Sequence, residues 1–98
     1  MKRVIRTTPY VVNLDSIAAE VAKDNPTAAV DLWLHIDDQV EKLADPNFPR
    51  KVGRVKGTQE LVAHENYILI LEEDFDTVTA LNVVHVRRQW PPKLQRDK

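Results

Sequence analysis

The 98-residue sequence contains no cysteine, only two glycines and no long apolar run. The absence of cysteine excludes disulfide bonds, thiolate metal sites and a cysteine nucleophile. The longest apolar run, residues 67–71, is far shorter than the roughly 20 residues that a membrane-spanning helix requires. Met1-Lys2-Arg3 is not followed by the apolar segment of a signal peptide. We therefore expect a soluble domain with a cytoplasmic location and no membrane partner.

The residues that are present have the composition of a globular protein, with 43% hydrophobic residues, 30% charged residues and a formal net charge of −1. Low hydrophobicity combined with high net charge would indicate disorder, and neither is found. Basic residues dominate blocks 1–8, 46–64 and 80–98, and acidic residues dominate the two blocks between them. If the basic blocks converge in the fold, they form a positive patch for one acidic or anionic partner. Otherwise they are solvated faces of mixed sign.

The N-terminal half predicts a short strand followed by a helical hairpin. Residues 2–7 have the pattern of a strand, and a helix then begins with Thr8 as N-cap and Pro9 at its first position. Asn25-Pro26 ends this helix and caps the next, which we expect to extend to Ala44. Apolar residues recur three or four positions apart in both helices, and the tight connection predicts an antiparallel pair.

The C-terminal half predicts three strands. A basic loop continues to Gly57 without a periodic pattern, and strands follow at residues 59–64, 67–71 and 78–86. The order β-α-α-β-β-β defines an α+β domain: a helical hairpin on one face of a three-stranded antiparallel meander, with the first strand added at its edge. We expect this single domain to span residues 1–92, followed by a flexible basic tail at 93–98.

Several local motifs, in this order and at these spacings, resemble a known family. They are Leu14–Ala18, Asp24–Pro26, Val40–Ala44, Gly53–Val62, Asn66–Ile68 and Val84–Pro91. Together with the element order, they resemble the RelE/ParE superfamily of bacterial type II toxin–antitoxin toxins over residues 9–91. The resemblance implies a small growth-inhibiting toxin. It also implies a cognate antitoxin, whose C-terminal half wraps around the toxin in a hetero-oligomer.

The superfamily has two branches with different targets and one fold, so individual residues must distinguish them. RelE-like toxins cleave mRNA on the ribosome, and ParE-like toxins poison DNA gyrase. Metal-free RNA cleavage needs a base, an acid and cations that stabilise the phosphorane, and RelE-like toxins place basic residues on the middle strands. The corresponding positions here are Val62 and Ile68, and no Lys or Arg lies between Lys56 and Arg87. This absence favours the ParE-like branch, a gyrase-binding inhibitor rather than an enzyme.

A ribosome-dependent mRNA endoribonuclease is the alternative, with His85, Arg87 and Arg88 as its catalytic candidates. His85 and Arg87 would project to one side of the last strand and could supply acid and phosphate chemistry. The structural interpretation is that His85 is hydrogen-bonded at the sheet edge and holds the C-terminal segment, while His64 is an exposed turn residue. The three scattered histidines lack zinc-site spacing, so we expect no metal and no cofactor. A degenerate toxin, retained only as an antitoxin partner, is a third alternative.

Two sets of residues are candidate binding surfaces. The target-binding candidates are cations and an indole, which are typical of binding hot spots: Arg54, Lys56, Arg87, Arg88 and Trp90. In the second helix, residues 32–34 are all apolar and exceed one buried stripe, so at least one should be exposed. We expect an antitoxin helix to dock on Leu32, Trp33 and Ile36. The competing interpretation is ordinary core packing.

Overall fold

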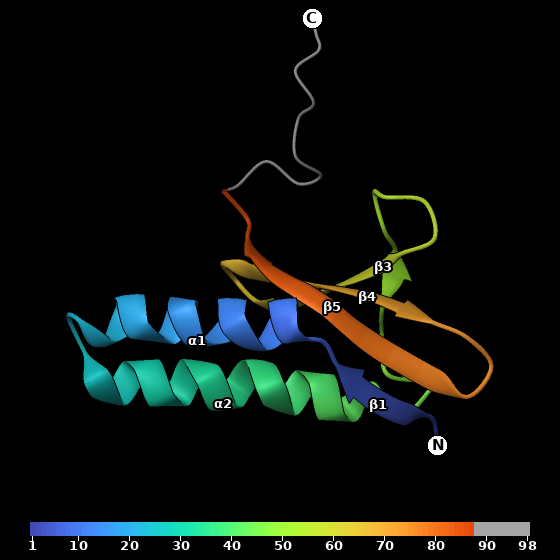
Figure 1. The fold of residues 1–98 in the computed structure, drawn as a ribbon, viewed down its shortest axis with the longest axis horizontal. Helices are drawn as coiled ribbons and strands as arrows, with labels where there is room; N and C mark the ends of the chain where they lie inside the picture. Colours follow the sequence, from blue (N-terminus) through green and yellow to red (C-terminus); the bar gives the residue numbers. More distant parts are fainter. Residues whose placement is uncertain (88–98) are drawn as a thin grey trace, which may run out of the picture.

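The computed structural model describes residues 1–87 and arranges them in two layers, a sheet and a pair of helices (Figure 1). The sheet contains β1 (Arg3–Arg6), β2 (Lys51–Val52), β3 (Gln59–His64), β4 (Tyr67–Glu73) and β5 (Thr77–His85), in the order β1-β5-β4-β3-β2. The second layer contains α1 (Thr8–Ala22) and α2 (Pro26–Lys42). β1 is parallel to β5, and the other neighbours are antiparallel. The predicted α+β class, element order and edge position of the first strand are confirmed.

The two helices begin at capping side chains, one of which differs from the prediction. The N-cap of α1 is Thr7 rather than Thr8, because Thr7 Oγ1 accepts a hydrogen bond from the Tyr10 N–H at 3.3 Å. The same hydroxyl lies 2.9 Å from the Ala80 carbonyl oxygen of β5, to which it donates. Asn25 caps α2 as predicted, with its Oδ1 accepting from Ala28 N at 3.0 Å. The caps therefore fix both helix starts.

The main core lies between the helices and the sheet. α1 contacts β5 and α2 contacts β3. Side chains alternate along the strands, so one face of the sheet meets the helices. The fully buried residues of this layer include Tyr10, Leu14, Ile36, Val40, Leu43, Leu69, Leu71, Val78 and Val83. In residues 1–87, no helix is long and apolar enough to cross a bilayer.

The opposite face of the sheet, here called the open face, has no helix on it within the described residues (Figure 1). A smaller buried cluster of Ile68, Ile70 and Val84 lies on this face, and Leu81 packs against it. β4 is consequently buried on both faces, as its continuous apolar run predicts. The centre of the open face is therefore apolar and is formed mainly by β4 and β5.

Several element bounds differ from the prediction: β1 spans Arg3–Arg6 rather than residues 2–7, and β5 spans Thr77–His85 rather than residues 78–86. β2 is a strand that we did not predict, in the segment before Gly57 that we expected to be irregular. Two residues are too few to show alternation, and pairing with β3 creates the strand. β4 continues to Glu73 because Glu72 and Glu73 pair with Thr79 and Val78 of β5, and the Glu73 carboxylate lies 2.7 Å from Lys2 Nζ and 3.2 Å from Arg50 Nη1. α2 ends at Lys42, before Ala44. The expected domain end at residue 92 and the tail at 93–98 lie outside the described residues.

Candidate functional site

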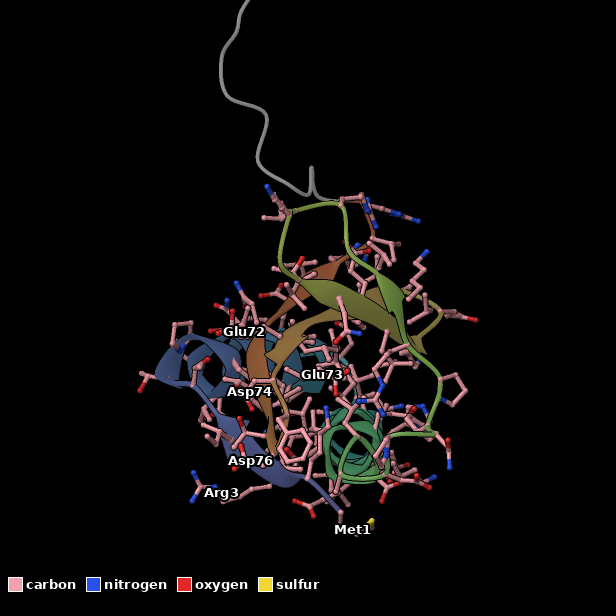
Figure 2. The ribbon with its side chains drawn as sticks, turned by 90° about the vertical axis from the view of Figure 1, so that its right-hand side faces the viewer. Met1, Arg3, Glu72, Glu73, Asp74 and Asp76 are labelled. Carbon is pink, nitrogen blue, oxygen red and sulfur yellow. The ribbon has the colours of Figure 1, made fainter. Side chains whose placement is uncertain are left out.

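Lys2 and Arg3, in the first basic block, contact the end of β4 and the acidic turn that follows it. Lys2 Nζ lies 2.7 Å from Glu73 Oε2 and donates to the Asp74 carbonyl oxygen at 2.7 Å. Arg3 N donates to the Asp76 carbonyl oxygen at 2.9 Å, and Figure 2 shows these residues at one end of the molecule. For the first basic block, this pairing favours the alternative of faces with mixed sign over one shared positive patch.

Arg6 also has a structural partner. Its Nε lies 2.8 Å from Asp37 Oδ1, and its Nη2 lies 2.7 Å from Glu41 Oε2. The Tyr10 hydroxyl donates to the same Asp37 oxygen at 2.9 Å. The hydrogen bond to Asp37 raises the pKa of Arg6, while burial and then the hydrogen bond to Asp37 raise the pKa of Tyr10. Arg6 stays charged and Tyr10 stays protonated, so this network joins β1, α1 and α2.

Arg50, in the second basic block, fastens the segment after α2 to the sheet. Its side chain is only 5% exposed and lies 3.2 Å from Glu73 Oε2. The guanidinium donates to the carbonyl oxygens of Phe48 at 2.9 Å and Asp45 at 2.6 Å. Burial raises the pKa of Glu73, but hydrogen bonding by Lys2 and the charge of Arg50 outweigh burial and lower it. Arg50 therefore stabilises the fold and is not a candidate for target binding.

The candidate Arg54 is held by a buried carboxylate. Glu60 is 1% exposed and accepts hydrogen bonds from Arg54 N at 2.9 Å and from Arg54 Nη2 at 3.1 Å. Burial raises the pKa of Glu60, but the bonds from Arg54 and the charge of Lys51 lower it on balance. The Arg54 side chain is still half-exposed, and Lys56 is exposed. Glu60 thus anchors the start of a basic loop whose side chains reach the surface.

The shape of this loop depends on both glycines of the chain. A Cβ at Gly53 would lie 2.9 Å from the Thr58 carbonyl oxygen, so only glycine fits this close approach. Gly57 has φ +85°, a left-handed conformation that favours glycine. Thr58 closes the loop, because its hydroxyl donates to the Val55 carbonyl oxygen at 2.6 Å. We call residues 53–58 the basic loop.

The structure does not bring the basic loop next to Arg87. The loop precedes Gln59 at one end of β3, whereas Arg87 follows His85 at the end of β5 that pairs with Tyr67. In Figure 1 both segments lie on the side of the sheet away from the helices, separated along the strands. Arg87 is exposed, and the candidates Arg88 and Trp90 lie outside the described residues. The described target-binding candidates therefore flank the open face at two ends.

The middle of the open face carries no cation at the positions where RelE-like toxins would need one. Val62 and Ile68 are direct cross-strand partners of β3 and β4. Val62 is 54% exposed and Ile68 is 7% exposed within the apolar cluster. Neither side chain could supply the positive charge that stabilises a phosphorane during RNA cleavage.

The three histidines, which we expected to be scattered, lie in a row with Tyr67. The ring centroids of His35 and His64 are 6.1 Å apart, those of His64 and Tyr67 5.8 Å, and those of Tyr67 and His85 5.1 Å. His64 is half-buried within this row rather than an exposed turn residue. Its packing against α2 could not be read from the sequence, because it depends on how α2 lies on β3. Within residues 1–87, no cluster of His, Asp or Glu side chains is placed to hold a metal ion.

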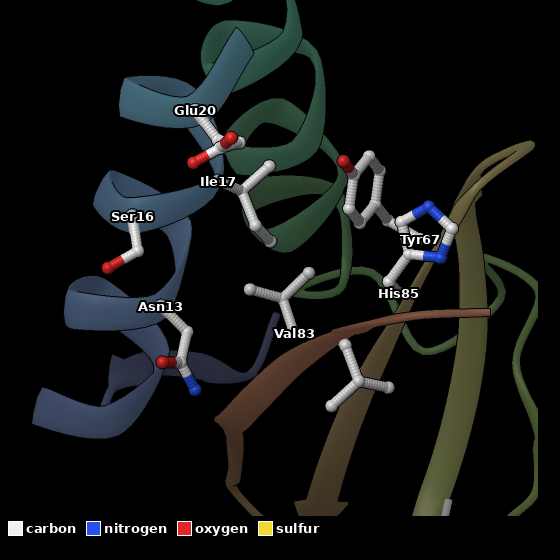
Figure 3. Close-up of a pocket in the computed structure, with 8 residues that line it drawn as sticks. Asn13, Ser16, Ile17, Glu20, Tyr67, Val83 and His85 are labelled. Carbon is white, nitrogen blue, oxygen red and sulfur yellow. The ribbon is translucent and has the colours of Figure 1, made fainter. Parts of the chain in front are cut away.

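His85 lies in a cleft of about 350 Å³ between α1 and β5 (Figure 3). Ser16 and Glu20 come from the helix side, while Tyr67 and His85 come from the sheet side. His85 Nδ1 accepts a hydrogen bond from the Arg87 N–H at 3.0 Å. This bond agrees with the interpretation that His85 holds the end of the last strand.

The predicted antitoxin-binding residues differ in exposure. Ile36 is 0% exposed and belongs to the core, so it cannot contact a partner on the surface. Leu32 and Trp33 are half-buried against the core, and the third residue of the run, Leu34, is 56% exposed, as its all-apolar neighbourhood predicts. Val30, one helical turn before Leu34, is also exposed. Our prediction did not include Val30 and Leu34 as a pair, although their spacing of four residues places them on the same face of the helix.

Comparisons with known proteins identify the family. Residues 3–90 match the sequence profile of the ParE toxin of the type II toxin–antitoxin system parDE. The protein named "Putative toxin Y4kP" from Sinorhizobium fredii is 34% identical over 93 residues, which cover 95% of this chain and 97% of the relative. A solved chain described as the chromosomal ParDE toxin–antitoxin system from P. aeruginosa has the same fold. It has a TM-score of 0.77 and 20% identity, covering 89% of this chain and 98% of that chain.

The chain therefore belongs to the ParE toxin family of type II toxin–antitoxin systems. The resemblance to the RelE/ParE superfamily, and to its ParE-like branch, is confirmed. The profile match also extends over Arg87, Arg88 and Trp90.

Proposed function

We propose that the toxin inhibits growth by binding and poisoning DNA gyrase in the cytoplasm, not by cutting RNA. The observation that supports this most is the apolar centre of the open face, where Val62 and Ile68 occupy the positions that RNA cleavage would require to be basic. Membership of the ParE family points in the same direction. The described candidates His85 and Arg87 lie at one strand end, where Nδ1 of His85 is already engaged by a backbone N–H.

The target-binding surface in this proposal consists of the basic loop and the sequence segment 87–90, here called the arm. Lys56 is exposed, and Arg54 is half-exposed but held at its backbone by Glu60. A loop that is already ordered loses less conformational entropy on binding, which favours affinity. Arg88 and Trp90 follow Arg87 in the sequence, outside the described residues, and Arg and Trp are typical of binding hot spots. Such a surface fits an acidic region of a protein partner.

We also propose that a cognate antitoxin helix covers the outer face of α2. Val30 and Leu34 form an exposed apolar pair on this helix. The carboxylates of Asp31, Asp38 and Glu41 border Leu34. An amphipathic helix with apolar residues on one face and basic residues beside them would match this surface. The half-buried side chains of Leu32 and Trp33 would then lie at the edge of this antitoxin-binding surface.

The experiment that tests the target uses purified toxin released from its antitoxin. One arm measures gyrase supercoiling and gyrase–DNA cleavage complexes, and the other measures mRNA cleavage on programmed ribosomes. We expect trapped gyrase–DNA complexes and intact mRNA. Cleaved mRNA with normal supercoiling would overturn the proposal in favour of an endoribonuclease that uses His85, Arg87 and Arg88. Inactivity in both arms, from a toxin that still folds, would indicate a degenerate toxin.

A double variant tests whether gyrase poisoning depends on the arm. Arg87→Ala/Arg88→Ala should abolish gyrase poisoning without unfolding the domain, because Arg87 is exposed and its side chain has no ion pair within the described residues. The control is Lys23→Ala, an exposed cation at the far end of α1. Unchanged poisoning by the double variant would remove the arm from the target-binding surface. Loss of the thermal unfolding transition would show that the arginines support the fold instead.

A further inference from the structure

The second half of β5 has no neighbouring strand on one of its edges. β1 pairs with β5 only over Thr77–Ala80, and the chain then turns into α1. The pairing of β5 with β4 shifts register between Ala80 and Asn82, and a bulge of this kind bends the strand where β1 ends. Within residues 1–87, no strand continues the line of β1 beside residues 81–85. We call this part of β5 the free edge.

The hydrogen bonds around the free edge show which backbone groups face it. Residues of an antiparallel strand direct their backbone groups alternately to the two sides. Val86 N donates to the Asn66 carbonyl oxygen at 2.8 Å, so Val86 faces β4. Val83, three positions earlier, faces the other side, and its N–H donates to Asn82 Oδ1 at 2.8 Å. The N–H of His85 and the carbonyl oxygens of Val83 and His85 therefore face the free edge, where an added strand would bond with them.

The cleft of about 350 Å³ between α1 and β5 lies beside this free edge (Figure 3). Ile17, Tyr67 and Val83 give the cleft apolar walls, and Ser16 and Glu20 of α1 lie at its exposed rim. Side chains of a strand point alternately to the two faces of a sheet, so every second side chain of an added strand would face α1 and this cleft. Main-chain groups at a sheet edge and a pocket for alternate side chains are the two features that bind an extended peptide.

The row of rings connects this cleft with the outer face of α2. Tyr67 and His85 line the cleft, and His35 lies beside Leu34 in a shallow hollow on α2. Between them lies His64, and successive ring centroids are 6.1, 5.8 and 5.1 Å apart. Extended residues rise about 3.3 Å each, so about five of them span the row. A chain that covers Leu34 can therefore continue along the row to the free edge.

The surface along this path is acidic. Four carboxylates line the hollow on α2, those of Asp31, Asp37, Asp38 and Glu41. Arg6 and Lys42 pair with some of them, but two cations leave a net negative charge. Glu20 borders the cleft, and its contact with Lys23 is an exposed pair of small energetic weight. Charge complementarity therefore favours a segment that carries basic side chains.

We propose that the free edge of β5 binds an extended, basic segment of the cognate antitoxin. This segment adds a strand to the sheet beside residues 83–85 and places one side chain in the cleft. The proposal rests on the proposed function only in taking the antitoxin as the chain that covers α2. It involves neither gyrase nor the arm, so the outcome of the gyrase assays does not affect it.

The first test is amide hydrogen exchange, measured by nuclear magnetic resonance on the full-length toxin alone and in complex with its cognate antitoxin. The His85 amide should exchange at least about tenfold more slowly in the complex, because it gains a main-chain acceptor. The Val84 amide, which faces β4, is the internal reference and should change less. Isotope-filtered spectra should show contacts between the backbone of Val83 or His85 and the antitoxin backbone. Unchanged exchange at His85 in a complex that forms, or contacts from side chains alone, would overturn the proposal.

The second test compares two substitutions at one position. His85→Pro removes the N–H at the free edge without taking a bond from β4, whereas His85→Ala keeps that N–H. Both variants lose the ring contact with Tyr67 and the Nδ1 bond, so the difference between them reports on the N–H alone. Antitoxin affinity should be about fivefold weaker in His85→Pro, the loss expected for one hydrogen bond. Equal affinities in two folded variants would refute the added strand. If His85→Pro does not fold, the exchange measurement on the unmodified toxin decides.

The third test concerns the basic character of the segment. Glu20→Lys should weaken antitoxin binding about fivefold at low salt, because it places a like charge beside the cleft. Asp24→Lys is the matched control, since it makes the same charge change at an exposed residue that does not line the cleft. Equal effects of the two variants would show that no basic side chain lies beside Glu20.

The failure of this proposal can be distinguished from that of the antitoxin site on α2. If Val30→Lys/Leu34→Lys leaves antitoxin affinity unchanged while the His85 amide is still protected, the site on α2 is wrong and the free edge remains a binding site. If the double variant weakens binding and the His85 amide is unaffected in the wild-type complex, the site on α2 remains and the added strand is refuted.

Discussion

At the scale of single residues, buried carboxylates determine which basic residues are structural. Arg50 and Lys2 meet at Glu73, and Arg54 meets Glu60, so these three cations are neutralised at short range. The sequence shows the charges but not these pairs, because each pair joins residues from different elements. Lys56 and Arg87 are the candidates that face solvent and form no salt bridge within residues 1–87.

The Glu60–Arg54 pair leads to a prediction about pH. The folded-state pKa of Glu60 lies below its unfolded value, so its stabilisation is full above the unfolded pKa and is lost as the pH falls through the folded pKa. Glu60→Gln should therefore lower the free energy of unfolding at pH 7 by about 1–3 kcal/mol. It should also make stability depend less on pH in the acid range.

Urea denaturation of Glu60→Gln at pH 7 and in the acid range checks this prediction. Glu65→Gln is the matched control, because Glu65 is exposed in a turn and should change stability by less than about 0.5 kcal/mol. A Glu60→Gln variant with the acid sensitivity of the wild type would show that the carboxylate is not the group responsible.

At the scale of elements, the sequence predicts the regular parts well. β3 spans Gln59–His64 as predicted, and Asn25 caps α2 as predicted, because both depend on local signals. The sequence predicts the cap of α1 at Thr8 because Pro9 would then be the first helical residue, but Thr7 offers the same hydroxyl one position earlier. The hydrogen bond from Thr7 to the Ala80 carbonyl, 73 positions away, distinguishes them.

This difference between adjacent threonines can be measured. Thr7→Ala removes both the N-cap acceptor and the bond to β5, so we expect a loss of about 1–2 kcal/mol in the free energy of unfolding. Thr8→Ala changes an exposed residue in the first turn and should cost less than about 0.5 kcal/mol. Chemical denaturation of the two variants compares them directly, and equal losses would reassign the cap.

The basic loop allows a second comparison, between its two glycines. Gly57→Ala places a side chain in open space but at φ +85°, which costs about 1–2 kcal/mol. Gly53→Ala would also force Cβ to within 2.9 Å of a backbone oxygen, so it should destabilise the protein more. Thermal unfolding of both variants ranks them. A Gly53→Ala variant as stable as the wild type would show that the loop moves easily and is not ordered.

At the scale of the whole molecule, the two proposed binding surfaces lie on different layers. The apolar pair Val30 and Leu34 is on α2, whereas Lys56 and Arg87 belong to segments on the other side of the sheet (Figure 1). From the sequence we predicted the cations Lys56 and Arg87 and an apolar patch on α2, but we placed that patch on Leu32, Trp33 and Ile36. It could not show that Ile36 is buried or that the histidines form a row, because both depend on how the helical layer lies on the sheet.

Because the surfaces are separate, substitutions should affect neutralisation and toxicity independently. Val30→Lys/Leu34→Lys places charges on the apolar pair, so antitoxin affinity should fall by at least about tenfold while gyrase poisoning persists, as expected when hydrophobic contacts at an interface are lost. Lys56→Ala/Arg87→Ala should weaken gyrase poisoning while antitoxin affinity persists. Arg54→Ala is unsuitable as a test, because it would leave Glu60 buried without its guanidinium partner. Titration calorimetry with the antitoxin and supercoiling assays with gyrase measure the two activities. If one double variant removed both activities in a folded protein, the antitoxin and the target would share one surface, and neutralisation would operate by direct competition.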